Sequence, residues 1–136
     1  MALPSHFQLL IGRPVQSNAE LASVAESGIP TGSISVLQEC GLAQGEIAKI
    51  IPPRTLKHRR SRRESLSIAE TDRVLRVGRI LDLAQEIFGS SEKALLWLRG
   101  PDGRYGQRAP LDLLSTETGG RLVENMLWQI NEGIFA

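Results

Sequence analysis

The longest periodic run of hydrophobic positions lies between Ile68 and Phe88. Apolar residues recur there at steps of three and four, which is the spacing of one face of an α-helix. A second apolar stripe runs beside the first, so this helix is expected to be buried against two neighbours, with a second copy of the chain as a candidate for one of them. The first stripe is Val74, Val77, Leu81, Ala84 and Phe88, and the second is Leu75, Ile80, Leu83 and Ile87.

Shorter apolar repeats predict further helices on both sides of this segment. Residues that cap or end helices mark their limits: Ser17 or Asn18, Gly28, Gly41, and Ser115 or Thr116. The expected helices span 19–27, 31–40, 92–98, 110–114 and a final segment from 116 to 133, with a Gly-rich loop over 99–108. Because no stretch alternates apolar and polar residues with period two, the sequence predicts an all-α fold.

Two short helices are expected on either side of Pro52 and Pro53. Proline lacks an amide proton and disfavours a helical conformation in the residue before it, so the pair interrupts the helix. In the first helix Leu42, Ile47 and Ile51 share one side, and residues 54–60 restart as a basic second helix. This is the layout of a helix-turn-helix, whose second helix enters the major groove of DNA.

Positive charge is concentrated in the same stretch. Residues 49–63 include seven basic side chains and no acidic one, whereas the segments before and after each carry a net charge of −3. A basic run alone is commonly a solvated surface or a flexible arm, but its place after the helix-turn-helix pattern favours phosphate binding. The predicted DNA-binding residues are Gln44, Arg54, Thr55, Lys57, Arg59, Arg60, Arg62 and Arg63.

The sequence offers no constellation for catalysis. With His6, His58 and Cys40 as its only histidines and cysteine, the chain has neither a metal-ligand spacing nor a nucleophile–base pair. The glycines over 100–106 follow no predicted strand and precede no Gly-Lys-Ser/Thr, so they predict a turn rather than a phosphate-binding loop. We therefore expect a protein that is not an enzyme and that needs no metal and no cofactor.

Organisation and compartment follow from composition and length. No run of eighteen apolar residues predicts a membrane span, and no basic leader predicts a signal peptide. A single cysteine suits the reducing cytoplasm, where Cys40 is expected to be a small buried apolar group. We expect an extended or poorly ordered arm over 1–16, a DNA-binding domain over 17–64 and a second helical domain over 65–136.

Several short pieces of the chain form a recognisable set. They are Thr55-Leu56, Ala69-Glu70-Thr71-Asp72-Arg73, Phe88-Gly89, Trp97-Leu98, Pro110-Leu111-Asp112-Leu113-Leu114, Thr116, Gly119 and Gly133-Ile134-Phe135-Ala136. Their order and spacing from about residue 41 onward strongly resemble the Xre-type antitoxins of the ParS/MbcA group, which neutralise RES-domain toxins in bacteria. The loop before Pro110 departs from the paired glycines usual in that family, because residues 105–108 read Tyr-Gly-Gln-Arg.

The resemblance implies a protein with two functions. The N-terminal half resembles an Xre-like helix-turn-helix domain that binds the operator of its own operon, and the C-terminal half resembles a domain that dimerises and binds the toxin. Toxins of such systems consume NAD or transfer its ADP-ribose, and the antitoxin blocks access to their active site. The toxin-binding residues expected on this basis are Trp97, Arg99, Pro110, Leu111, Leu114, Ile130, Ile134, Phe135 and Ala136.

The rival interpretation is a dimeric helix-turn-helix transcription regulator whose C-terminal half only dimerises or senses a ligand. The apolar tail over 134–136 favours the antitoxin, because a partner-binding protein has a use for an exposed apolar segment. The alternative for the tail is that it folds back onto the core. A membrane-surface role is disfavoured, because the basic block lacks an interleaved apolar face.

Overall fold

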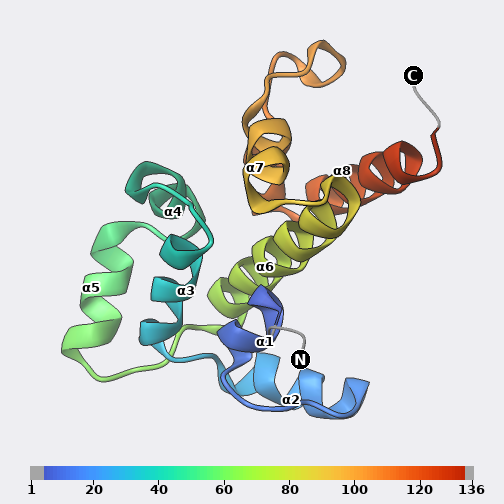
Figure 1. The fold of residues 1–136 in the computed structure, drawn as a ribbon. Helices are drawn as coiled ribbons and strands as arrows, with labels where there is room; N and C mark the ends of the chain where they lie inside the picture. The colour runs from blue at the N-terminus through green and yellow to red at the C-terminus, as the bar shows by residue number, and fades with distance from the viewer. Residues whose placement is uncertain (1–4, 134–136) are drawn as a thin grey trace.

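The computed structural model describes residues 5–133, which surround one long central helix, α6 (Ile68–Phe88) (Figure 1). Its bounds are those predicted from the apolar periodicity. Ser67 begins the helix with a capping box, in which the Ser67 hydroxyl accepts from the Glu70 amide at 3.2 Å and the Glu70 carboxylate accepts from the Ser67 amide at 2.8 Å. Gly89 ends it in the left-handed conformation, with a φ of 86°.

The remaining elements are short helices and 3-10 turns. They are α1 (His6–Ile11), α2 (Asn18–Ser27), η1 (Thr31–Ser33), α3 (Ile34–Glu39), α4 (Gln44–Ile50), α5 (Pro53–Ser61), α7 (Ser91–Arg99), η2 (Gly103–Tyr105), η3 (Pro110–Ser115) and α8 (Glu117–Asn131). Between residues 5 and 133 the only extended pairing is an isolated bridge from Asp102 to Arg108, which confirms the all-α prediction. None of the helices in this range is long and apolar enough to cross a membrane.

The expectation of an extended arm over 1–16 is wrong for the helix α1. Asp82 of α6 accepts hydrogen bonds from the backbone amides of His6 at 2.8 Å and Phe7 at 3.0 Å, which caps the start of α1. Leu10 is completely buried and lies on Gly78, where a Cβ would come within 2.4 Å of its Cδ1 atom. A helix this short is held by such tertiary contacts rather than by its own propensity, so no periodic pattern marks it.

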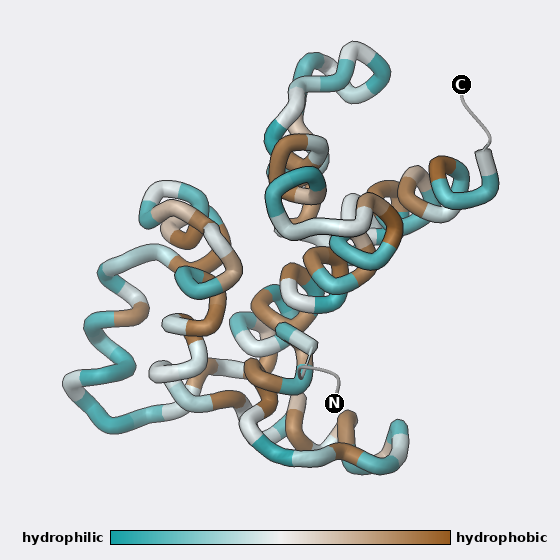
Figure 2. Tube along the Cα trace, in the orientation of Figure 1, coloured by the Kyte–Doolittle hydropathy of each residue, from teal (hydrophilic) through white to brown (hydrophobic). Residues whose placement is uncertain are grey.

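Most of both apolar stripes of α6 is covered by the same chain, and Leu83, Ile87 and Phe88 are half-buried at the edge of the core. The helix packs against α1, α2 and α4 and against α7, α8 and η3, and Val74, Ile80 and Ala84 have no exposed surface. Figure 2 shows hydrophobic positions along α6 and mostly hydrophilic ones along α5. The width of the apolar face of α6 therefore does not in itself require a second copy of the chain.

Two glycines let α8 approach its neighbours closely. A Cβ on Gly119 would lie 1.9 Å from the carbonyl oxygen of Leu113 in η3. A Cβ on Gly120 would lie 2.8 Å from Cδ of Arg76, whose guanidinium donates to the carbonyl of Leu114 at 3.1 Å. These contacts fix η3 in the angle between α6 and α8.

Candidate DNA-binding and partner-binding surfaces

The helices α4 and α5 form the predicted helix-turn-helix unit, at the side of the molecule away from α8 (Figure 1). The Glu46 carboxylate caps α4 by accepting from the Ala43 amide at 2.8 Å. Ile51 is buried with an extended backbone, and Pro53 occupies the first turn of α5, where its missing amide proton costs no hydrogen bond. The prolines thus turn the chain as the sequence predicts.

Most of the predicted DNA-binding side chains face solvent, on α5 and just after it. The exposed members are Gln44, Arg54, Lys57, Arg60, Arg62 and Arg63, and Thr55 is half-buried. Arg59 is half-buried, and its guanidinium pairs with Glu64 at 2.9 Å and with the buried Glu70 at 3.1 Å. The exposed Arg62 also pairs with Glu64, at 3.2 Å, so the contact with Glu70 is what distinguishes Arg59. The exposed arginines and Lys57 therefore form a basic surface on α5, whereas the side chain of Arg59 points toward the protein.

The C-terminal end of α5 has the geometry of a Schellman motif. The Glu64 amide donates to the carbonyl of Arg59 at 2.9 Å, and the Arg63 amide donates to the carbonyl of Arg60 at 3.1 Å. Arg63 has a φ of 54°, a left-handed conformation that favours glycine. An arginine therefore stands at a position where glycine would be more stable.

We expect Arg63→Gly to raise the free energy of unfolding by about 0.5–1 kcal/mol, because glycine adopts the left-handed conformation without strain. The same change is expected to weaken DNA binding about fivefold at 0.15 M salt, through the loss of one phosphate contact. Chemical denaturation and fluorescence anisotropy measure the two effects. In the matched variant Arg62→Gly, at a φ of −95°, affinity should fall without any gain in stability; a gain there would contradict this explanation.

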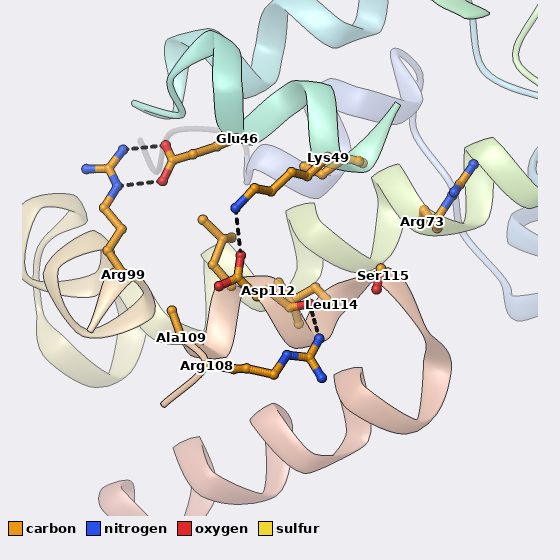
Figure 3. A pocket seen from close by; sticks show the side chains of 11 residues that line it. Glu46, Lys49, Arg73, Arg99, Arg108, Ala109, Asp112, Leu114 and Ser115 are labelled. Carbon is orange, nitrogen blue, oxygen red and sulfur yellow. Dashed lines mark hydrogen bonds and ion pairs between the residues drawn. The ribbon is translucent and has the colours of Figure 1, made fainter. Parts of the chain in front are cut away.

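A cleft of about 480 Å³ lies between the helix-turn-helix and the C-terminal helices (Figure 3). Arg99, at the end of α7, forms two hydrogen bonds of 2.8 Å to the Glu46 carboxylate and a third of 2.8 Å to the carbonyl of Gly41. Lys49 pairs with Asp112 of η3 at 3.3 Å. The hydrogen bonds from Arg99 lower the pKa of Glu46, and burial only partly opposes them. Ion pairs thus join the two halves of the chain across the cleft.

We expect the Glu46–Arg99 pair to stabilise the fold above pH 4.5, the ordinary pKa of the carboxyl group. Because the pKa is lowered in the folded state, this contribution is lost as the pH falls through the folded-state pKa. Glu46→Gln keeps a side chain that caps α4 but removes the charge, so the variant should lose about 0.5 kcal/mol at pH 7 and almost nothing at pH 3. Urea denaturation at both pH values measures this, and an equal loss at both would contradict it.

The predicted toxin-binding residues differ in how far they are buried. Pro110 and Leu114 are buried, Leu111 and Ile130 are half-buried, and Trp97 packs on Phe88 with ring centroids 5.7 Å apart. Arg99 is exposed at the edge of the cleft. The remaining predicted residues, Ile134, Phe135 and Ala136, lie outside the described part of the chain.

Three exposed apolar side chains on α7 and α8 were not predicted as partner-binding residues. Leu96 is 75% exposed, Trp128 is 44% exposed and Leu122 is 42% exposed. The exposure of Trp128 is unusual, because tryptophan on a helix is more often buried than exposed. The sequence signal for this exposure is that none of the three belongs to the buried apolar face of its own helix.

The loop between α7 and η3 keeps a glycine-like backbone. Gly106 has a φ of 67° and the following Gln107 has a φ of 63°, so both are left-handed. The sequence departure from paired glycines is thus accommodated by a glutamine in the same conformation. The loop is closed by the backbone bridge in which the Asp102 amide donates to the carbonyl of Arg108 at 3.1 Å. Within the loop Arg104 pairs with Asp102 at 2.8 Å, and the loop projects beyond α7 (Figure 1).

Little in the described residues points to catalysis. Burial, followed by the charges of Asp82 and Glu39, raises the pKa of the Cys40 thiol to about 12, as fits the buried apolar role predicted for it. No group of three or more metal-ligating side chains occurs within residues 5–133. The features that remain are the basic surface, the cleft and the exposed apolar side chains.

Comparison with known proteins accounts for both halves. Residues 20–79 match the Xre-like antitoxin helix-turn-helix domain, and residues 83–133 match the C-terminal toxin-binding domain of Xre/MbcA/ParS antitoxins. An Antitoxin Xre of Pseudomonas putida is 36% identical over 131 residues, covering 95% of this chain and 82% of the relative. The chain belongs to the Xre antitoxin family. Antitoxin Xre proteins of Yersinia enterocolitica and Photorhabdus laumondii are 30% and 29% identical, covering 93% and 91% of this chain and 88% and 86% of the relatives.

The two family domains meet within α6. The helix-turn-helix match ends at residue 79, about halfway along the helix, and the toxin-binding match begins at residue 83. In this Xre-family chain α6 therefore contributes to both domains, and the cleft with its ion pairs lies where they face each other. The expected boundary between residues 64 and 65 precedes this shared helix.

Proposed function

We propose that this Xre-family protein is an antitoxin that neutralises a cognate RES-domain toxin by blocking its active site. We also propose that it binds the operator of its own operon and represses it. The observation that carries the proposal is the pairing of two matched domains on one helix, with a basic surface on the first and exposed apolar side chains on the second. The RES toxin and the homodimer come from the family resemblance.

The C-terminal half supplies the proposed toxin surface. Trp97, Leu111 and Ile130 are half-buried, so each retains accessible apolar area. Pro110 and Leu114 belong to η3 and are buried, so they hold η3 in place and are not themselves accessible. Leu96 and Trp128 extend the accessible apolar area on the same two helices. Burying such side chains in a partner contributes on the order of 1.5–3 kcal/mol each when burial is complete. The tail residues Ile134, Phe135 and Ala136 are proposed to dock at or near the NAD-binding site of the toxin.

The N-terminal half supplies the proposed operator contact. Arg54, Lys57, Arg60, Arg62 and Arg63 are exposed on or beside α5 and are suited to phosphates. Gln44 lies at the start of α4, and Thr55 lies in the first turn of α5. Helix-turn-helix proteins bind two half-sites as dimers, which supports a homodimer independently of α6. Under this proposal the chain acts in the cytoplasm by occlusion, without cofactor or reaction.

Co-expression tests the proposal. A RES-domain protein encoded beside this chain should arrest growth of its host when produced alone, and this chain should restore growth and co-purify with the toxin. Protection must not require operator DNA on the plasmid, because the proposed mechanism is direct occlusion. If the chain binds DNA but neither protects cells nor binds the toxin, it is a transcription regulator whose C-terminal half only dimerises.

A further inference from the structure

Arg59 is held on its protein side by two carboxylates. Its Nε and Nη2 atoms donate to the two oxygens of Glu70 at 3.1 and 3.2 Å, and its Nη1 atom donates to Glu64 at 2.9 Å. This is the forked geometry in which a guanidinium binds a carboxylate most strongly. The charge of Arg59 is thus matched by two acidic groups before any DNA phosphate approaches.

Glu70 is part of the framework of α6. It is only 7% exposed, and its carboxylate also accepts from the Ser67 amide in the capping box. Burial opposes its ionisation, but hydrogen bonds from Arg59 and Ser67 outweigh this and lower its pKa. The carboxylate that holds Arg59 is therefore charged at neutral pH and fixed to the start of the central helix.

The helix α5 has few other anchors. None of its side chains is fully buried, and Leu56 is its only apolar side chain packed against the core. Among the helices and turns, η1 is the one with which α5 has its main packing contact. Since apolar contact alone holds α5 weakly, the hydrogen bonds between Arg59 and Glu70 are placed to set its orientation.

We propose that Arg59 is a positioning residue rather than a DNA contact, and that with Glu70 it clamps the DNA-reading helix α5 to α6. The inference rests on the proposed operator binding by α5 and goes beyond it, because it assigns a DNA-binding role to a buried acidic residue outside the helix-turn-helix. It also means that Arg59, which the sequence predicts as a DNA-binding residue, does not contact a phosphate.

Substitution of Glu70 tests the clamp, because the clamp and simple electrostatics predict opposite changes in DNA affinity. Glu70→Gln removes a negative charge beside the basic surface, which by electrostatics alone would strengthen DNA binding. The clamp predicts weaker binding instead, by roughly tenfold, the scale of a charge-assisted hydrogen bond. Glutamine still serves in a capping box, so α6 keeps its start. Fluorescence anisotropy with a duplex from the region upstream of the chain's own reading frame measures the affinity.

The salt dependence separates a clamp from a contact. For Arg59→Gln the affinity should fall while the slope of log K against log salt stays as in wild type, because no phosphate contact is lost. The matched variant Arg60→Gln should make the slope shallower by about 0.9. A slope change for Arg59→Gln equal to that for Arg60→Gln, or tighter binding by Glu70→Gln, would overturn the clamp.

Failure of the operator proposal would look different. In that case the wild-type chain would not bind the duplex, or Arg60→Gln would leave both affinity and slope unchanged. Circular dichroism checks that each variant is folded at the assay temperature. If Arg59→Gln unfolds, two other variants decide the question, Glu70→Gln and Arg59→Lys. The lysine keeps the positive charge but cannot form the forked pair of hydrogen bonds. If the clamp exists, both variants must weaken DNA binding without changing the slope of log K against log salt.

Discussion

The triple replacement of Arg60, Arg62 and Arg63 by alanine is expected to weaken operator binding about 150-fold at 0.15 M salt. All three side chains are exposed at the end of α5. Each phosphate that they neutralise releases counterions and contributes about 0.9 to the slope of log affinity against log salt. At 0.15 M salt one such contact is worth about fivefold, and three contacts multiply.

The slope itself is the sharper measurement. With four to six phosphates neutralised, the wild-type slope is expected to be roughly −4 to −5, and the triple variant should be shallower by about 2.7. Arg121→Ala, which removes an exposed arginine on α8, serves as the control and should change neither quantity. If the triple variant keeps the wild-type slope, α5 is not the DNA-binding helix.

Gly119→Ala is expected to be the most destabilising single change in the C-terminal half. The added methyl group would lie 1.9 Å from the carbonyl oxygen of Leu113 and 3.1 Å from the hydroxyl of Thr116. Because the first of these atoms belongs to the backbone, η3 or α8 must move as a whole. We expect a loss of about 3 kcal/mol or more, with the melting temperature lower by roughly 10 °C.

Thermal unfolding with a matched glycine replacement checks this expectation. Gly45 also lies in a helix, and a Cβ there would meet no atom within 4 Å. Gly45→Ala should therefore be neutral or slightly stabilising, since alanine is the better helix former. Equal melting temperatures for the two variants would contradict the close approach of α8 to η3.

The sequence was sufficient where a pattern is long or a residue is chemically decisive. The apolar periodicity between Ile68 and Phe88 specifies the bounds of α6. Pro52 and Pro53 specify the turn before α5. In each case the cause lies within a few residues of the effect.

What the sequence could not give depends on pairs that are distant along the chain. The helix α1 has a local capping box between Ser5 and Gln8, but its docking depends on Asp82, which also caps it, and on Gly78, which admits Leu10. Neither Asp82 nor Gly78 is near α1 in sequence. The contact between Glu46 and Arg99 joins positions 53 residues apart. The inward turn of Arg59 depends on Glu70, which lies on a different helix. Spacing rules describe one element at a time and do not identify such partners.

The central claim is that the C-terminal half of the chain blocks a toxin, and the tail offers its most direct test. The measurement is growth of cells that produce the cognate RES-domain toxin together with either the full chain or a chain ending at Gly133. We expect the shortened chain to lose most of its protection while its operator affinity and melting temperature stay near those of the full chain. A shortened chain that unfolds would show that the tail belongs to the core. A shortened chain that protects cells fully would contradict the role of Ile134, Phe135 and Ala136 in neutralisation.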